Sequence, residues 1–157
     1  MSTVSTPGPV TTVRSASIAK LPVAAAIFAL AGLTDAIYLT IHHYNATPVP
    51  CGEAFDCEMV LNSSWAEVGG VPLAAFGAVS YFIAFSLALL AAFGDGRMWK
   101  LFGILTTLMA LFSVWLIYVQ AFRIHAFCQF CLLSAATTFT LFIIYLVSIF
   151  VDRRSPV

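Results

Sequence analysis

Charged residues are scarce in this 157-residue chain: they make up 9% of it, against 61% for hydrophobic residues. Soluble domains contain about 25% charged residues, because a compact globule needs a hydrated surface. The shortage of charge excludes an ordinary soluble domain and predicts a chain that lies in lipid. The seven basic and seven acidic residues cancel, so no basic face is predicted for nucleic acid or for an anionic bilayer surface.

Long apolar stretches make up most of the sequence. Four of them run over residues 21–41, 73–93, 101–119 and 127–151, and a helix needs about 20 residues to cross the hydrocarbon core of a bilayer. Lone strands leave backbone polar groups unsatisfied in lipid, so the stretches are expected to be helices. The sequence therefore predicts an all-α membrane protein, a four-transmembrane-helix bundle with a long outer loop, residues 42–72, between its first and second helices.

The remaining residues form two short tails around this membrane domain. Residues 1–20 are rich in Ser, Thr, Val and Pro and lack a helical period, so they are expected to be a disordered cytoplasmic tail. Residues 21–151 are expected to form the four-helix catalytic domain, and residues 152–157 a second cytoplasmic tail. The first apolar stretch is too long for the core of a cleavable signal peptide and is expected to remain as an anchor.

Basic residues are absent from the long loop. Six of the seven Lys and Arg residues lie in the tails and in the helix ends opposite this loop, and Arg123 alone lies on its side. The positive-inside rule then puts both termini in the cytoplasm and the loop outside. We expect a multi-pass protein of the cell inner membrane whose active site faces the periplasm.

All four cysteines fall on the outer side. Cys51 and Cys57 lie in the loop, and Cys128 and Cys131 open the fourth helix. An even set of thiols in an oxidising compartment favours disulfide chemistry over a metal site. Their spacing leaves three interpretations open: structural disulfides that brace the loop of a non-catalytic membrane protein, a four-sulfur zinc site, and a redox relay.

The Cys-x-x-Cys formed by Cys128 and Cys131 favours the redox relay. Residues three apart in a helix have Cβ atoms about 5–6 Å apart, whereas a disulfide needs about 3.8 Å, so such a pair closes with strain and is easily reduced. Cys131 lies about one turn deeper than Cys128. One pair therefore faces water and the other borders the bilayer, where a lipid quinone would accept two electrons and two protons.

Further motifs follow in a fixed order along the chain. They are Gly32-Leu33-Thr34-Asp35-Ala36-Ile37-Tyr38-Leu39, Cys57-Glu58-Met59-Val60-Leu61-Asn62-Ser63-Ser64, Gly70-Val71-Pro72 and Phe76-Gly77. Together with the Cys-x-x-Cys, they resemble the vitamin K epoxide reductase family over about residues 21–150. The resemblance is to bacterial members without a fused thioredoxin domain.

This resemblance implies a bundle around a quinone, with the outer loop as its lid. By position, Cys51 is the thiol that a thioredoxin-like periplasmic protein attacks in trans, and Cys57 passes electrons to Cys128. Cys131 then reduces the quinone, of the ubiquinone, menaquinone or vitamin K type. The implied activity is that of a quinone-reducing oxidoreductase that supports disulfide formation, with no metal. An unrelated four-helix thiol oxidase would have its Cys-x-x-Cys in the first outer loop.

Four other residues are predicted to bind the quinone or to support the thiolate. Ser63 follows Cys57 by six residues, as in the family; the alternative is a helix N-cap or a plain loop serine. Asp35 is a carboxyl group within a membrane span, where such groups usually have a function; the alternative is a structural hydrogen bond. Phe76 and Phe130 are predicted to line the quinone pocket.

Two positions depart from the vertebrate pattern. Vertebrate relatives hydrogen-bond the quinone through an Asn near the start of the second helix and a Tyr one turn past the Cys-x-x-Cys. The matching residues here are Leu73 and Ala135, and neither side chain can donate a hydrogen bond. The resemblance therefore assigns no polar anchor for the quinone ring.

Overall fold

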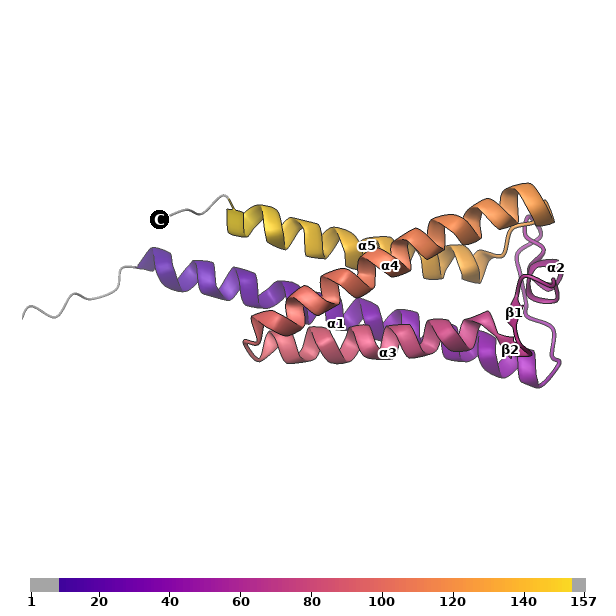
Figure 1. Cartoon of the computed structure of the whole chain (residues 1–157), viewed down its shortest axis with the longest axis horizontal. Coiled ribbons are helices and arrows are strands. Elements are labelled where there is room, and N and C mark those ends of the chain that lie inside the picture. Colours follow the sequence, from indigo (N-terminus) through magenta and orange to yellow (C-terminus); the bar gives the residue numbers. More distant parts are fainter. Residues whose placement is uncertain (1–8, 154–157) are drawn as a thin grey trace, which may run out of the picture.

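Four long helices form the protein. The structure, a computed structural model, describes residues 9–153 (Figure 1). The long helices are α1 (Pro9–Tyr44), α3 (Leu73–Ala92), α4 (Gly96–Val119) and α5 (Gln129–Arg153). Each contains a stretch long and apolar enough to cross a membrane. The predicted all-α membrane bundle is confirmed.

The helices pack as a ring in which neighbours along the chain are neighbours in space. α1 packs against α3, α3 against α4, α4 against α5, and α5 closes the ring against α1. A short turn, residues 93–95, joins α3 to α4. The long segment between α1 and α3 lies at the other end of the bundle, on the right in Figure 1, where α4 ends and α5 begins.

α1 begins earlier than the sequence analysis expected. It starts at Pro9, within the segment 1–20 that was expected to be a tail. Proline fits the first turn of a helix because its missing N–H has no partner there in any case, and residues 10–20 contain neither Gly nor Pro. α5 likewise continues to Arg153, within the expected second tail. The rest of the two tails, residues 1–8 and 154–157, lies outside the described residues.

The segment between α1 and α3, residues 45–72, is called the outer segment after its predicted side of the membrane, and it contains three short elements. α2 (Cys57–Leu61) is followed by the two-stranded antiparallel pair β1 (Glu67–Val68) and β2 (Val71–Pro72). The two residues between the strands, Gly69 and Gly70, both have positive φ angles of 62° and 82°, as a tight hairpin turn requires. A polar contact of 3.2 Å between His43 Nε2 and Glu67 Oε1 joins this hairpin to the end of α1.

The half of the bundle away from the outer segment is closed. Its core consists mainly of small residues from α1 and α3, with larger side chains from the other two helices: Ala25, Ala26, Ala29, Ala84, Ala88, Phe102 and Leu141. Small residues let helix backbones approach closely in a membrane. Trp99 stacks on Phe102 with ring centroids 4.8 Å apart, and its indole N–H donates to Ser148 Oγ at 2.8 Å.

Candidate active site

The outer segment contains a disulfide between Cys51 and Cys57. Cys57 opens α2, whose first turn is capped by the Asp56 carboxylate, which accepts a hydrogen bond of 3.0 Å from the Met59 N–H. The capped helix fixes the direction of the Cys57 side chain. Cys57 is only 1% exposed, whereas Cys51 is half-buried. A partner approaching this end of the bundle would therefore reach Cys51 first.

Two hydrogen bonds attach the loop to the start of α5. The Gly52 N–H donates to Gln129 Oε1 at 3.2 Å, and the Asp56 N–H donates to the Phe127 carbonyl at 3.0 Å. Gly52 directly follows Cys51, and Asp56 directly precedes Cys57. Both cysteines of the disulfide are thus held against the helix that contains the Cys-x-x-Cys.

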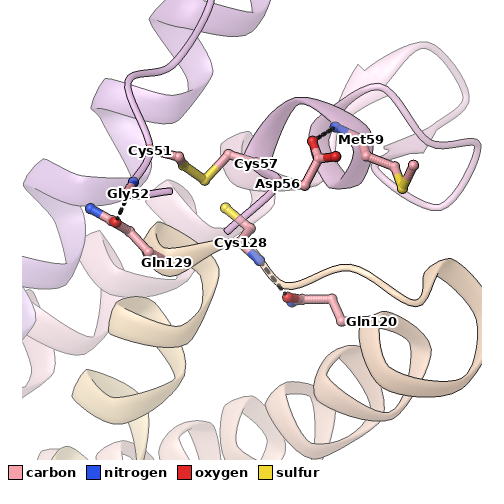
Figure 2. Close-up of a disulfide and its surroundings, with 8 residues drawn as sticks. All are labelled: Cys51, Gly52, Asp56, Cys57, Met59, Gln120, Cys128 and Gln129. Atoms are coloured by element: carbon pink, nitrogen blue, oxygen red, sulfur yellow. Dashed lines mark hydrogen bonds between the residues drawn. A yellow bond between two sulfur atoms is a disulfide. The ribbon is translucent and has the colours of Figure 1, made fainter. Parts of the chain in front are cut away.

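Cys128 lies directly below the disulfide. Figure 2 shows its side chain pointing toward the Cys51–Cys57 bond, and it is fully buried in one apolar cluster with Cys57, Val60 and Ala126. Its backbone N–H donates to Gln120 Oε1 at 3.0 Å. The side chain of Gln120 therefore fixes the start of α5 relative to the end of α4.

A π-helical turn positions Gln120. It spans η1 (Gln120–Ile124) at the end of α4, and such turns are frequent at functional sites. His125 ends the turn in the left-handed conformation, with φ of 58°. The chain then returns toward the bundle and reaches Cys128 within three residues.

Cys128 and Cys131 are free thiols. A hydrogen bond between their side chains is the largest influence on Cys128 and lowers its pKa from the ordinary 9.0 to about 7, although burial opposes the shift. The thiolate is the form that attacks a disulfide. At neutral pH, Cys128 is therefore poised for exchange with the disulfide above it.

A cavity of about 190 Å³ opens on the other side of Cys131. All four long helices and the outer segment contribute to its mainly apolar wall. Ligand sites in proteins are typically apolar hollows with a few polar groups that fix orientation. The lining includes Cys131, Asp35, Ser63, Leu73, Phe76 and Ala135.

The structure brings together most of the site residues predicted from sequence. Asp35, Ser63 and Phe76 line the cavity with Cys131. Ser63 follows α2 and donates its hydroxyl to the Val60 carbonyl at 2.7 Å, so it is not an N-cap. Phe76 is 48% exposed and borders the cavity from its outer side.

Phe130 was predicted to line the same pocket, but it lies outside the cavity wall that the described residues form. It packs against Tyr38 with ring centroids 5.5 Å apart and against the cluster around Cys57 and Cys128. The reason is helical geometry, because a residue one position from Cys131 points about 100° away around the helix.

Sequence reasoning missed three polar side chains. Gln120 and Gln129 make the hydrogen bonds described above, and Tyr81 donates to the Ser134 carbonyl at 2.7 Å and bonds Thr138 Oγ1 at 2.8 Å in the cavity wall. Gln129 stands between the two cysteines, and Gln120 ends an apolar run, so both had a sequence signal. Tyr81 had none, since aromatic residues are frequent throughout the chain.

A four-sulfur zinc site was another interpretation of the cysteines. Among the described side chains, those of residues 20–153, no group of three or more His, Cys, Asp or Glu is arranged to hold a metal ion. Two of the four sulfur atoms that zinc would need are joined to each other. The geometry of the described cysteines is that of a disulfide beside a dithiol.

The amino-acid sequence is similar to those of known proteins. The profile of the vitamin K epoxide reductase family matches residues 23–146. The thiol-disulfide oxidoreductase LTO1 of Arabidopsis thaliana is 34% identical over 122 residues, which cover 70% of this chain and 32% of that protein. The chain thus spans about a third of the length of this curated relative. Both matches support a redox role for the cysteines, and this chain belongs to the vitamin K epoxide reductase family.

Proposed function

We propose that the chain is a quinone-dependent thiol oxidoreductase that supports disulfide formation. Electrons enter from a thioredoxin-like periplasmic dithiol at Cys51–Cys57, pass to Cys128–Cys131, and leave to a membrane quinone of the ubiquinone, menaquinone or vitamin K type. The observation that carries the proposal is the position of Cys128, a buried free thiol directed at the disulfide and hydrogen-bonded to Cys131 at the cavity wall.

Each transfer is a balanced thiol–disulfide exchange. The partner's dithiol reduces the Cys51–Cys57 disulfide and becomes a disulfide itself. The Cys57 thiolate then attacks Cys128 within a Cys128–Cys131 disulfide, which releases Cys131 as a thiolate. Cys51 finally attacks Cys57 and releases Cys128, so that two electrons have moved from the loop to the inner pair.

The bonding of the two pairs distinguishes a relay from two structural disulfides. The outer pair is a disulfide, whereas the inner pair is a dithiol. This is the state expected after electrons have reached the inner pair and before they leave it. Two purely structural disulfides would not account for free thiols buried beside an existing disulfide.

The cavity has the features that a quinone ring would require. Its wall is mainly apolar and includes Cys131. The wall also contains one buried carboxyl oxygen, Asp35 Oδ2, to which no described residue is hydrogen-bonded. A bound quinone would supply an acceptor for two electrons and two protons. Ser63 and Phe76 would contact it from the outer side, and Asp35 from α1.

The proposed orientation puts the disulfide in the periplasm and both termini in the cytoplasm. It rests on the distribution of charge, because six of the seven Lys and Arg residues lie at the end of the bundle away from the disulfide or in the tails. Such a bias sets the orientation of multi-pass membrane proteins. The partner would then be a thioredoxin-like dithiol on the periplasmic side of the membrane.

The proposal is tested with protein purified in detergent. A reduced thioredoxin-fold dithiol protein is supplied, and quinone reduction is followed by absorbance. Cys131→Ala should reduce the rate to background, because no second thiol remains to form the inner disulfide. Leu133→Ala, at a 55% exposed position two residues further along α5, should keep the rate. An active Cys131→Ala variant, or an inactive wild-type protein, would refute the relay.

A further inference from the structure

One buried polar atom is left without a partner. Among the side chains of residues 20–153, Asp35 Oδ2 is the one buried oxygen or nitrogen that makes no hydrogen bond. Buried polar groups in proteins are almost always paired, and a carboxyl group within a membrane span is costly and usually functional. An unpaired carboxyl oxygen at this depth points to a ligand that supplies the missing partner.

The orphaned oxygen belongs to the wall of the cavity that also includes Cys131. Asp35, Leu39 and His43 are four residues apart along α1, so they share one helix face, and all three line the cavity. Leu73 and Ala135 line it as well, and neither can hydrogen-bond a ring oxygen.

The other titratable groups of the wall are already engaged. From α3, the Tyr81 hydroxyl bonds Ser134 and Thr138. From α1, His43 is paired with Glu67, and from α5, Cys131 is hydrogen-bonded to Cys128. The described lining residues of α4 include no titratable side chain. Asp35 is thus the wall's unengaged acid.

We propose that Asp35 is the catalytic acid of the quinone site, donating a hydrogen bond and then a proton to one carbonyl oxygen of the ring. This inference rests on the proposed function and identifies a group that anchors and protonates the acceptor. A protonated carboxyl has one O–H donor, and a neutral acid is far less costly in an apolar cavity than a carboxylate.

The proton balance closes around Asp35. The Cys128 thiolate and the Cys131 thiol lose two electrons and one proton when their sulfur atoms form a disulfide. The ring gains both electrons and two protons. Asp35 delivers one of these protons and recovers the one that Cys131 releases, and the second proton comes from water on the outer side. Asp35 therefore begins and ends each cycle as the acid.

The test separates binding from proton transfer. Asp35→Asn keeps a hydrogen-bond donor of the same shape but cannot supply a proton, whereas Asp35→Leu removes both abilities. We expect Asp35→Asn to bind a short-tailed soluble quinone normally, measured by quenching of tryptophan fluorescence, and to oxidise its inner dithiol about 100-fold more slowly. We expect Asp35→Leu to bind about 5- to 10-fold more weakly as well. Thr34→Val, at the exposed neighbouring position, is the control and should match wild type.

Infrared difference spectroscopy gives a readout that does not depend on turnover. Adding the same quinone to the wild-type protein should shift a carboxylic acid C=O band, and this shift should be missing in Asp35→Asn. A wild-type rate in Asp35→Asn, or no carboxyl band in the wild-type spectrum, would overturn the assignment. The quinone-reduction assay with Cys131→Ala distinguishes this failure from a failure of the relay. If Asp35→Asn has the wild-type rate and Cys131→Ala is inactive, the relay stands but Asp35 is not its acid. If Cys131→Ala is active, the relay itself fails.

Discussion

The same four helices pack differently at the two ends of the bundle. At the end away from the disulfide, alanine side chains and Gly103 allow close approach, and the rings of Trp99, Phe102 and Tyr145 fill the remaining space. At the disulfide end, the helices enclose a cavity of about 190 Å³ beneath the outer segment. The closed half thus has the features of a scaffold, and the hollow half has those of a reaction site.

Polar groups follow the same division. In the closed half, Trp99 donates to Ser148, and Thr106 donates to the Phe102 carbonyl at 2.9 Å. The hollow half contains two free thiols and an unpaired carboxyl oxygen. A buried polar atom without a partner reduces stability, and the proposed reaction accounts for this cost in the hollow half. Substitutions in the two halves should therefore separate activity from stability.

The largest expected effect lies in the hollow half. Cys131→Ala removes the hydrogen bond that lowers the pKa of Cys128 to about 7, so this pKa should rise toward the ordinary 9.0. A higher pKa means less thiolate at a given pH. At pH 7 the thiolate fraction should therefore fall from about one half to about 1%, measured by thiolate absorbance in the ultraviolet.

A double variant provides the baseline for this titration. Cys51 and Cys57 do not titrate while they form a disulfide, so Cys128→Ala with Cys131→Ala reports the tyrosine background alone. Cys131→Ser, which keeps a donor, should give an intermediate pKa. An unchanged Cys128 titration in Cys131→Ala would show that the two thiols do not interact.

The second effect lies in the closed half and concerns stability. A Cβ atom at Gly103 would overlap the Tyr145 ring, so Gly103→Ala should lower the free energy of unfolding by about 1–3 kcal/mol. Gly96→Ala places the same group in open space at the start of the same helix and should be neutral or stabilising by up to about 1 kcal/mol. Thermal unfolding in detergent measures both, and equal stabilities would contradict the packing of this half.

The smallest effect concerns the hydrogen bond that attaches the disulfide loop to the start of α5. Gln129→Ala removes the hydrogen bond to the Gly52 N–H, and a net loss of about 1 kcal/mol would slow the exchange between loop and helix roughly fivefold. Gln129→Glu keeps an oxygen acceptor and should retain most of the rate. Stopped-flow measurement of electron transfer from the loop pair distinguishes them. Identical rates in the wild type and both variants would mean that this bond does not position the loop.

The membrane helices could be predicted from sequence because hydrophobic length is a strong local signal. The apolar stretch that begins at Leu73 correctly predicted the start of α3. The number of membrane spans between the cysteines predicted that all four lie near one end of the bundle. The start of α1 at Pro9 was not predicted, because a tail without a hydrophobic period can continue a helix that the membrane span has already begun.

The finer placement of the site could not be predicted, because it depends on which face of each helix turns inward. Phe130 and Cys131 are adjacent in sequence, yet only Cys131 reaches the cavity. The roles of Gln120 and Gln129 depend on a π-helical turn and a loop path that no periodicity reveals. Long-range polar contacts of this kind are decided by tertiary packing.

The central claim is that Cys57 and Cys128 exchange a disulfide. Added quinone keeps Cys128 and Cys131 oxidised to a disulfide. Cys51→Ala then leaves Cys57 as a free thiol that can attack Cys128 and release Cys131, and Cys57→Ala is the matched control that leaves Cys51 instead. Peptide mass spectrometry of the unreduced proteins should find a Cys57–Cys128 cross-link in the first variant and no Cys51–Cys128 cross-link in the second. A Cys57 thiol that remains fully free for alkylation, or cross-links of equal yield in both variants, would contradict the relay.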